Sequence, residues 1–400
     1  MHVKAIDAVR ALLAWTVVVA HICWFTGADL RFPFWRFVHP LAAAAVSIFI
    51  IISGFVIANL LITKQEGYGP YIARRALRIF PVYLICLVVG VITTYLTLYT
   101  FLDLPWGPKT PHSDELIKQS ESLASGLYVH AIAHVLLLQG IIPDNALYYA
   151  QHMFLDSAWS LSLEWQFYLV APVIIWAMLR HQVGIAVCAL AACAFVAYSM
   201  GVFGVYALPS LLPAGILLFL TGIITRLAFP HLPRLRRYPT TLLIVLGALA
   251  LRNIHFLPLV AWAALVGLLK LEDKPWQRWP FVQSASGSLA TLGRWSYSTY
   301  LVHVPVIQTI MFVAVKIFGS GAEPTLCIVL ALTAPITLLL SFLLYRYVEE
   351  PTIVFGKRIF APPIGLPQPQ LDQHKPIPLV RAVLAGQSQR TSQSRSALLF

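Results

Sequence analysis

Three polar side chains in the first apolar segment share one helical face and are suited to acid–base chemistry. Asp7, Arg10 and His21 lie at offsets of 0, 3 and 14 residues, which at about 100° per residue places them within roughly 60° of one another. His21 lies about 16 Å beyond Arg10, at about 1.5 Å per residue. Histidine suits general-base catalysis near neutral pH. The structural alternative, an interfacial ion pair and a hydrogen-bonded interior histidine, fits the spacing about equally well.

Two arginines three residues apart open a later apolar segment, "GPYIARRALRIFPVYL". Arg75 and Arg78 would project side by side from one helix, and paired guanidinium groups can bind phosphate oxygens bidentately. The structural alternative is strong, because basic residues flank the cytoplasmic ends of most membrane helices. Composition alone leaves both interpretations open.

One carboxylate, Glu164, lies within the apolar stretch "WSLSLEWQFYL". A charged group in hydrocarbon is costly unless it is paired or hydrated, so Glu164 indicates a functional site. Asp156 and Ser160 are possible N-caps of the same helix, and a carboxylate near a helix N-terminus is favoured by the helix dipole. His303 and Glu349 are further polar residues within or at the end of apolar segments, and both permit a structural interpretation as well.

Membrane-spanning helices must position these residues, because 59% of the chain is apolar and only 11% is charged, against about half and a quarter in soluble domains. A spanning helix needs about 20 apolar residues. We expect an all-α polytopic integral membrane protein with ten spans, at residues 6–25, 40–62, 79–100, 161–179, 183–200, 211–227, 238–251, 256–271, 295–318 and 325–345. The first segment has no small-residue cleavage site after it, which favours a retained span over a signal peptide.

The distribution of Lys and Arg predicts which side of the membrane each connection faces. We take 128–142 as non-spanning, because it is short and contains His130 and His134; one face then receives 18 Lys and Arg residues and the other 6. The positive-inside rule makes the first face cytoplasmic, together with both termini. The short segments 238–251 and 256–271 either span twice or form a re-entrant hairpin, and neither choice changes the sides.

The remaining segments carry no further catalytic signature. We expect one transmembrane domain over residues 1–358, a polar extracytoplasmic loop over 103–126 and a disordered cytoplasmic tail over 361–400, which is rich in Pro, Gln and Ser. The five cysteines lie in apolar runs without CxxC spacing, so we expect neither disulfides nor a metal site. The net charge of +12 is explained by membrane-flanking residues, so we expect no nucleic-acid partner.

Six sequence blocks, taken together, resemble the acyltransferase-3 family of membrane O-acyltransferases. They follow the family's order over about residues 5–355: "IDAVRALLAWTVVVAH", "SIFIIISGFVI", "YIARRALRIFPVYL", "WSLSLEWQFYL", "WSYSTYLVHVPV" and "YRYVEEP". One such block would be weak, but six in order are specific. The resemblance implies an inner-membrane enzyme that moves an acyl group, commonly acetyl from acetyl-CoA, to a hydroxyl of a carbohydrate such as O-antigen, capsule or exopolysaccharide.

The resemblance also implies roles for individual residues. The implied catalytic residues are His21 and Glu164. The implied donor-binding residues are Arg75, Arg78 and Arg10. The implied supporting residues are Asp7, Trp159, Ser160, His303 and Glu349. Where the family often has a second acidic residue after Glu164, this chain has Trp165.

The chemistry that the resemblance implies fits the predicted topology. Acyl-CoA would be a donor substrate and not a permanently bound cofactor, with its phosphates on the arginines at the cytoplasmic mouth. His21 would take the proton of an acceptor hydroxyl or accept the acyl group itself, and Glu164 would orient that imidazole or hold the acceptor. The expected partners are the bilayer, acyl-CoA and a carbohydrate or glycolipid acceptor, with the oligomeric state open.

A multi-span transporter of a small polar or acylated substrate is the alternative function from another class. Transporters of this kind are often built from internal repeats. The sequence contains no internal repeat that we can recognise.

Overall fold

The computed structural model describes residues 4–28, 33, 37–64, 66–103, 111–232, 247, 253–270, 280–318 and 322–360. Within these ranges the chain is helical and contains no strand. The longer helices are α1 (Lys4–Phe25), α3 (Val38–Lys64), α4 (Tyr68–Asp103), α5 (Pro111–Val135), α6 (Trp159–Met178), α7 (His181–Ser199), α8 (Leu212–Ala228), α10 (Leu257–Lys270), α11 (Pro280–Arg294), α12 (Ser296–Phe318), α13 (Ala322–Leu344) and α14 (Glu350–Ile359). Short 3₁₀ turns lie at Gln139–Ile141, Asp156–Ala158 and Ile254–Phe256, and Tyr345–Glu349 is π-helical.

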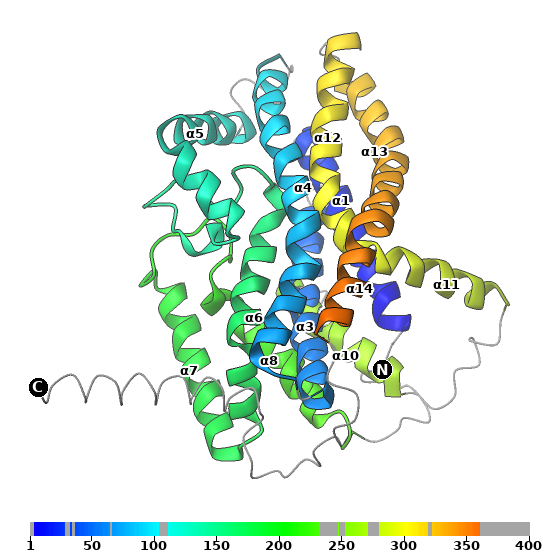
Figure 1. The fold of residues 1–400 in the computed structure, drawn as a ribbon. Helices are drawn as coiled ribbons and strands as arrows, with labels where there is room; N and C mark the ends of the chain where they lie inside the picture. The colour runs from blue at the N-terminus through cyan, green and yellow to red at the C-terminus, as the bar shows by residue number, and fades with distance from the viewer. Residues whose placement is uncertain are drawn as a thin grey trace, which may run out of the picture.

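Seven segments are long and apolar enough to cross a membrane: Ala5–Phe25, Val38–Lys64, Tyr68–Thr97, Asp156–Met178, Gln182–Ser199, Ser296–Phe318 and Cys327–Ile359. The protein is therefore an all-helical, multi-pass membrane protein. Most of these helices run side by side along one axis (Figure 1).

The predicted count of ten spans differs from the seven found among the described residues. Two of the predicted spans are the shorter helices α8 and α10, of 17 and 14 residues, which at about 1.5 Å per residue reach only about 26 and 21 Å of the roughly 30 Å hydrocarbon core. The third, 238–251, lies outside the described residues except for position 247. The choice between two spans and a re-entrant hairpin there stays a prediction.

Within the hydrophobic core, helices α3 and α8 approach each other closely at two glycines. A Cβ atom added at Gly222 would lie 2.6 Å from the backbone nitrogen of Phe55, and one added at Gly54 would lie 3.0 Å from the carbonyl carbon of Phe219. The two backbones therefore touch, as small residues allow in membrane helix pairs. Helix α3 is apolar on nearly every side, which is typical of a helix that is buried all round.

Helix α4 carries the arginine pair and joins both ends of the bundle. Its 36 residues extend about 54 Å at about 1.5 Å per residue. It packs against α12, and its first turns pack against α14, where the guanidinium of Arg74 lies 3.5 Å from the carbonyl oxygen of Phe360. The end of α14 therefore lies beside the start of α4, at the lower end of Figure 1.

The connection predicted as a polar loop over 103–126 is helical from Pro111 onward, because α5 occupies Pro111–Val135. The helix bends at Gly126, whose backbone is not helical, and it lies at the opposite end of the molecule from α14 (Figure 1).

The segment 128–142 is not among the seven apolar spans, in agreement with its prediction as non-spanning. Burial lowers the pKa of His134 to about 3, although its ring also hydrogen bonds to the carbonyl of Ala150.

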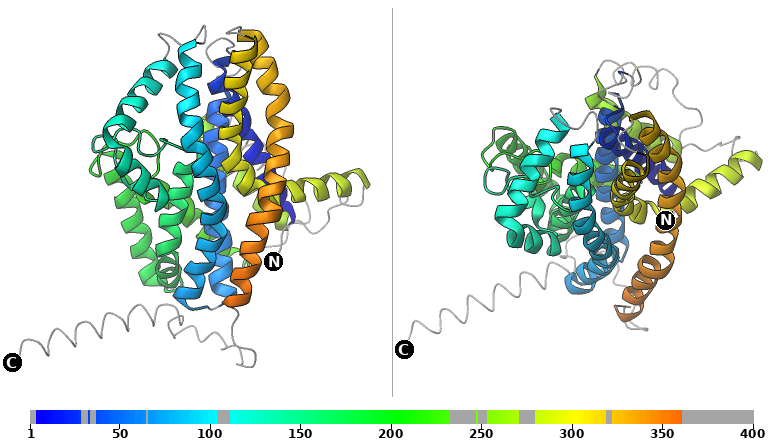
Figure 2. Two further views of the ribbon diagram at one scale, coloured as in Figure 1. Left: turned by 45° about the horizontal axis from the view of Figure 1, so that its top comes forward. Right: turned by 90° about the horizontal axis from the view of Figure 1, so that it is seen from above.

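Helix α11 was not predicted, because it mixes polar and apolar residues and so gives no apolar run. It packs against α1 and extends away from the bundle in both views of Figure 2. The predicted disordered tail, 361–400, lies outside the described residues.

Candidate active site

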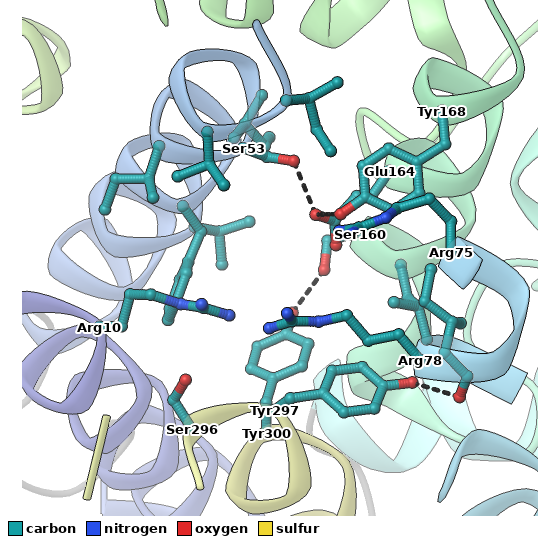
Figure 3. Close-up of a pocket in the computed structure, with 18 of the residues that line it drawn as sticks. Arg10, Ser53, Arg75, Arg78, Ser160, Glu164, Tyr168, Ser296, Tyr297 and Tyr300 are labelled. Atoms are coloured by element: carbon teal, nitrogen blue, oxygen red, sulfur yellow. Dashed lines mark hydrogen bonds between the residues drawn. The ribbon is translucent and has the colours of Figure 1, made fainter. Parts of the chain in front are cut away.

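A cavity of about 120 Å³ lies among α1, α3, α4, α6 and α12, and its polar lining combines three arginines and one carboxylate with hydroxyl groups (Figure 3). We call it the arginine cavity. Its polar residues are Arg10, Ser53, Arg75, Arg78, Ser160, Glu164, Tyr168, Ser296, Tyr297 and Tyr300. The structure thus brings together five residues that the sequence analysis proposed separately: the three arginines, Ser160 and Glu164.

The guanidinium groups of the arginine cavity have hydrogen-bonding capacity to spare. Arg10 and Arg78 extend from different helices and point toward one another across the cavity (Figure 3). The Nε atoms of Arg10 and Arg75 are buried and have no hydrogen-bond partner among the described residues, and the Arg75 guanidinium lies 5.9 Å from the centre of the Tyr168 ring. Buried donors normally find acceptors, so this cavity has the chemistry of an anion site.

Glu164 is held by hydroxyl groups in the same cavity. It accepts a hydrogen bond of 2.7 Å from Ser53 Oγ and a second, short one from the hydroxyl of Tyr168. Arg10 and Arg78 are close enough to interact with it electrostatically. Its burial is therefore offset by two donors and two cations. Of its two predicted roles, orienting the His21 imidazole finds no contact among the described residues, where Glu164 is bonded to Ser53 and Tyr168, and holding the acceptor stays a prediction.

A pair of hydroxyl groups closes one end of the arginine cavity. Ser160 Oγ and Tyr300 Oη are 2.7 Å apart, and Tyr300 also packs against the ring of His303, with ring centres 6.0 Å apart. Ser160 Oγ also donates to the carbonyl oxygen of Ser157 over a long distance of 3.5 Å, so the Tyr300 hydroxyl donates to Ser160 Oγ. This pair joins the arginine cavity to the histidines.

His21 and His303 form a hydrogen-bonded pair whose tautomers follow from their partners. His303 Nδ1 is 3.1 Å from the carbonyl oxygen of Thr299, and a carbonyl can only accept, so Nδ1 carries the hydrogen. In neutral His303 the Nε2 atom is then an acceptor, and His21 Nδ1, 2.7 Å away, must donate to it. Neutral His21 therefore carries its free lone pair on Nε2.

His21 Nε2 faces a second cavity, of about 260 Å³, which we call the histidine cavity. It is lined by Ala20, His21, Trp24, Phe25, His39, Ala42, Thr94, Thr97, Glu115, Leu116, Gln119, Tyr149, His152, Met153, Phe154, Asp156, Leu208 and Gln308. Asp156 Oδ2 lies 3.5 Å from His21 Nε2, and Asp156 Oδ1 makes a short hydrogen bond with His152 Nδ1. Burial opposes the charging of His152, but the Asp156 carboxylate outweighs it and raises the pKa of His152 above its ordinary 6.5.

The other predicted supporting residues lie in different places. Glu349 is buried and accepts a hydrogen bond of 2.8 Å from Ser298, with Arg78 as its charged neighbour. Trp159 begins α6 and packs on the hydrophobic core. Asp7 lies in the first turn of α1, and its backbone is in close contact with Gly293 of α11.

Sequence reasoning missed two residues of the histidine cavity, His152 and Asp156. Asp156 was taken only as a possible cap of the following helix, and its side chain instead lies between two imidazoles. The available signal was an acidic residue at a membrane boundary four residues after a histidine. That spacing does not identify the partner, because His21 is far away in sequence.

The fold and these two cavities define a multi-pass membrane protein with one cavity lined by three arginines and a second lined by His21, His152 and Asp156. The sequence model of the family described as an acyltransferase domain matches residues 3–346. The chain therefore belongs to the acyltransferase-3 family, and it is a membrane acyltransferase. No curated protein and no solved structure gave a match.

Proposed function

We propose that this protein transfers an acetyl group from acetyl-CoA, bound from the cytoplasmic side, to a hydroxyl of a cell-surface or exported carbohydrate in the inner membrane. The observation that carries the proposal is the position of His21. Its Nε2 faces the histidine cavity, while its ring is linked through His303 and Tyr300 to the end of the arginine cavity.

The arginine cavity suits the donor. The diphosphate of coenzyme A is anionic, and the spare N–H groups of Arg10 and Arg75 match phosphate oxygens. From Arg10 to His21 along α1 is about 16 Å at about 1.5 Å per residue, so a thin, extended arm is needed to bring a thioester to the histidine. The pantetheine arm of coenzyme A is such an arm. The expected cytoplasmic position of the arginines agrees with this direction of entry.

The junction between the cavities suits the reacting group. With the thioester carbonyl beside the pair Ser160–Tyr300, the Ser160 hydroxyl would exchange its long bond of 3.5 Å to the Ser157 carbonyl for one to the thioester oxygen as negative charge develops there. His21 Nε2 would take the proton of the acceptor hydroxyl as its oxygen attacks the carbonyl carbon. The C–O bond forms, the C–S bond breaks, and the proton passes to the thiolate of coenzyme A.

The histidine cavity suits a carbohydrate acceptor. Its lining combines the aromatic side chains of Trp24 and Tyr149 with the polar groups of Glu115 and Gln119. Such a mixture of flat apolar surfaces and a few polar groups is typical of sites for small polar ligands. Gln119 donates to the carbonyl of Met153, which leaves its amide oxygen free to accept from a sugar hydroxyl.

The position of Asp156 favours direct transfer over an acyl-histidine intermediate. Direct transfer produces an Nε2–H imidazolium, which the carboxylate 3.5 Å away would stabilise. Acylation of Nε2 would leave no N–H to face Asp156. The same atom is needed in both routes, so the loss of His21 tests the proposal as a whole.

The test compares His21→Ala with His255→Ala, since His255 is exposed and lies outside both cavities. Membranes from a strain without the gene, supplemented with each variant, receive acetyl-CoA labelled in its acetyl group, and mass spectrometry follows labelled acetyl groups on the surface glycan. We expect labelling with the wild type and His255→Ala and none with His21→Ala at equal protein levels. Full labelling by His21→Ala would remove this histidine from the reaction.

A further inference from the structure

Asp156 lies between two imidazole rings and touches each with a different oxygen. Its Oδ2 atom is 3.5 Å from His21 Nε2, and its Oδ1 atom is hydrogen bonded to His152 Nδ1. All three side chains are partly open to the histidine cavity, with exposed fractions of 21% for His21, 26% for Asp156 and 14% for His152. A single carboxylate is thus shared by two groups that can each become cationic.

The contact between Asp156 and His21 changes in character as a proton is transferred. In neutral His21 the Nε2 atom carries a lone pair, because Nδ1 donates to His303, so Nε2 and the carboxylate oxygen face each other without a hydrogen between them. When Nε2 takes the proton of an acceptor hydroxyl, an N–H⁺ group faces the carboxylate. The attraction exists only after proton transfer begins, which is the condition for stabilising a transition state over a ground state.

His152 competes for the same carboxylate. Burial alone would lower the pKa of His152, but Asp156, followed by Glu115 and Asp144, raises it above the ordinary value of 6.5. Once protonated, His152 forms an ion pair with Asp156 through the Nδ1–Oδ1 contact. A carboxylate that is already paired with a cation stabilises a second cation less.

The other titratable groups around this pair do not replace Asp156. Those facing His21 are His303 of α12, His39 of α3, His152 and Asp156. Those facing His152 are Asp156, Glu115 of α5, Asp144, and the imidazoles of His21 and His134. His134 stays neutral because burial lowers its pKa to about 3. Among these described neighbours, the carboxylate in contact with both His21 and His152 is that of Asp156.

We propose that Asp156 is the charge partner of His21 during proton transfer and that protonation of His152 withdraws that partner, so that acid on the histidine-cavity side slows acyl transfer. Both are positioning residues, since they act through His21. The inference rests on the proposed function of His21 as general base. It adds two residues, and a direction of pH control, to that function.

The first variant removes the charge of Asp156 and keeps its shape. Asp156→Asn should lower kcat with labelled acetyl-CoA and glycan-bearing membranes by about ten-fold or more, because one favourable charge contact in the transition state is lost. The KM for acetyl-CoA should stay unchanged, since the arginine cavity is intact. A kcat equal to that of the wild type would overturn the role of Asp156.

The second variant removes the titration of His152. His152→Asn keeps an N–H donor near the position of Nδ1 but never ionises. On the acid side, log kcat/KM against pH should fall more steeply in the wild type, where both His21 and His152 take up a proton, than in the variant, where the slope should be about 1 for His21 alone. At about pH 6 the variant should therefore keep a several-fold larger share of its own maximal rate. Parallel profiles would refute the control by His152.

Two controls separate this inference from the proposed function and from misfolding. His255→Asn, at an exposed site away from the cavities, should reproduce the wild-type pH profile. Coenzyme A should raise the Tm of the detergent-purified wild type and of both variants equally, which shows that the donor site is folded. If His21→Ala is inactive while Asp156→Asn and His152→Asn match the wild type, this inference fails and the proposed function stands. If His21→Ala is fully active, the proposed function itself fails.

Discussion

Replacing both Arg75 and Arg78 with Lys tests whether the arginine cavity binds phosphate through directed hydrogen bonds or only carries positive charge. Lys keeps the charge and therefore keeps the membrane sidedness that Lys and Arg specify together. It removes the planar fork of N–H donors, because an ammonium acts as a compact point charge. The two interpretations left open by the sequence thus predict different outcomes for the same variant.

The expected magnitude follows from the donors that the structure leaves available. Arg75 Nε has no partner among the described residues, and Arg78 points across the cavity toward Arg10 (Figure 3). Each charge-assisted hydrogen bond is worth about 1.5 to 3 kcal/mol, so losing one should raise the KM for acetyl-CoA by roughly ten-fold to 100-fold. The acceptor's KM should change less, because the acceptor is expected in the histidine cavity.

The matched control is Arg74→Lys, one residue away on the same helix. Arg74 pairs with Glu66 and lies 3.5 Å from the carbonyl oxygen of Phe360, and it does not line the arginine cavity. Both KM values are measured in membranes with labelled acetyl-CoA at equal protein levels. We expect Arg74→Lys to keep the wild-type KM for acetyl-CoA. If the double variant keeps the wild-type KM for acetyl-CoA and the wild-type rate, Arg75 and Arg78 serve only to specify the sidedness of the membrane helices.

Three further predictions concern the fold. Gly222→Ala should abolish the monodisperse folded protein in size-exclusion chromatography, because the added Cβ would meet the backbone of α3. The control Gly69→Ala should elute like the wild type, because its Cβ meets nothing within 4 Å. Equal elution of the two variants would contradict the close packing of α3 and α8. Burial lowers the pKa of His134 in α5 to about 3. Local opening of α5 therefore takes up a proton when the pH is below the ordinary pKa of 6.5, and the local stability of α5 should fall as the pH drops below that value. Amide hydrogen exchange around α5, corrected for intrinsic rates, that does not change between pH 7.5 and about pH 5.5 would refute this prediction. A reporter inserted at Asn145 should be extracytoplasmic, and a cytoplasmic signal there would show that 128–142 spans the membrane.

The sequence predicted the residues that one helix places together. Arg75 and Arg78 project into one cavity because a three-residue spacing puts them on one face of α4. Arg10 and Glu164 reach the same cavity from other helices. The family resemblance grouped Arg10 with Arg75 and Arg78, but it placed Glu164 with His21, since helical periodicity says nothing about which helices are neighbours. The positions of the long spans also followed from apolar runs, which the bilayer imposes directly on sequence.

The sequence could not predict the contacts that join distant segments. Ser53 is 111 residues from Glu164, and it donates to that carboxylate. The pair of His21 and His303 is separated by 282 residues. Each of these residues taken alone has an ordinary structural interpretation, and only the packing of α1 and α3 against α12 and α6 shows which polar groups share a partner. Helix α11 escaped prediction for a different reason, because its mixed composition gives no apolar run.

The two cavities also differ in charge, and this difference bears on the proposed transfer of an acyl group from a donor in one to an acceptor in the other. The arginine cavity combines three guanidiniums with one carboxylate, while the histidine cavity has the carboxylates of Glu115 and Asp156 and no Lys or Arg in its described lining. Phosphates are attracted to the first and repelled by the carboxylates of the second. An anionic donor would therefore be retained on the arginine side, and a neutral sugar hydroxyl could approach from the other. What crosses between them at His21 is then an acyl group and a proton, neither of which needs the charged part of the donor to pass.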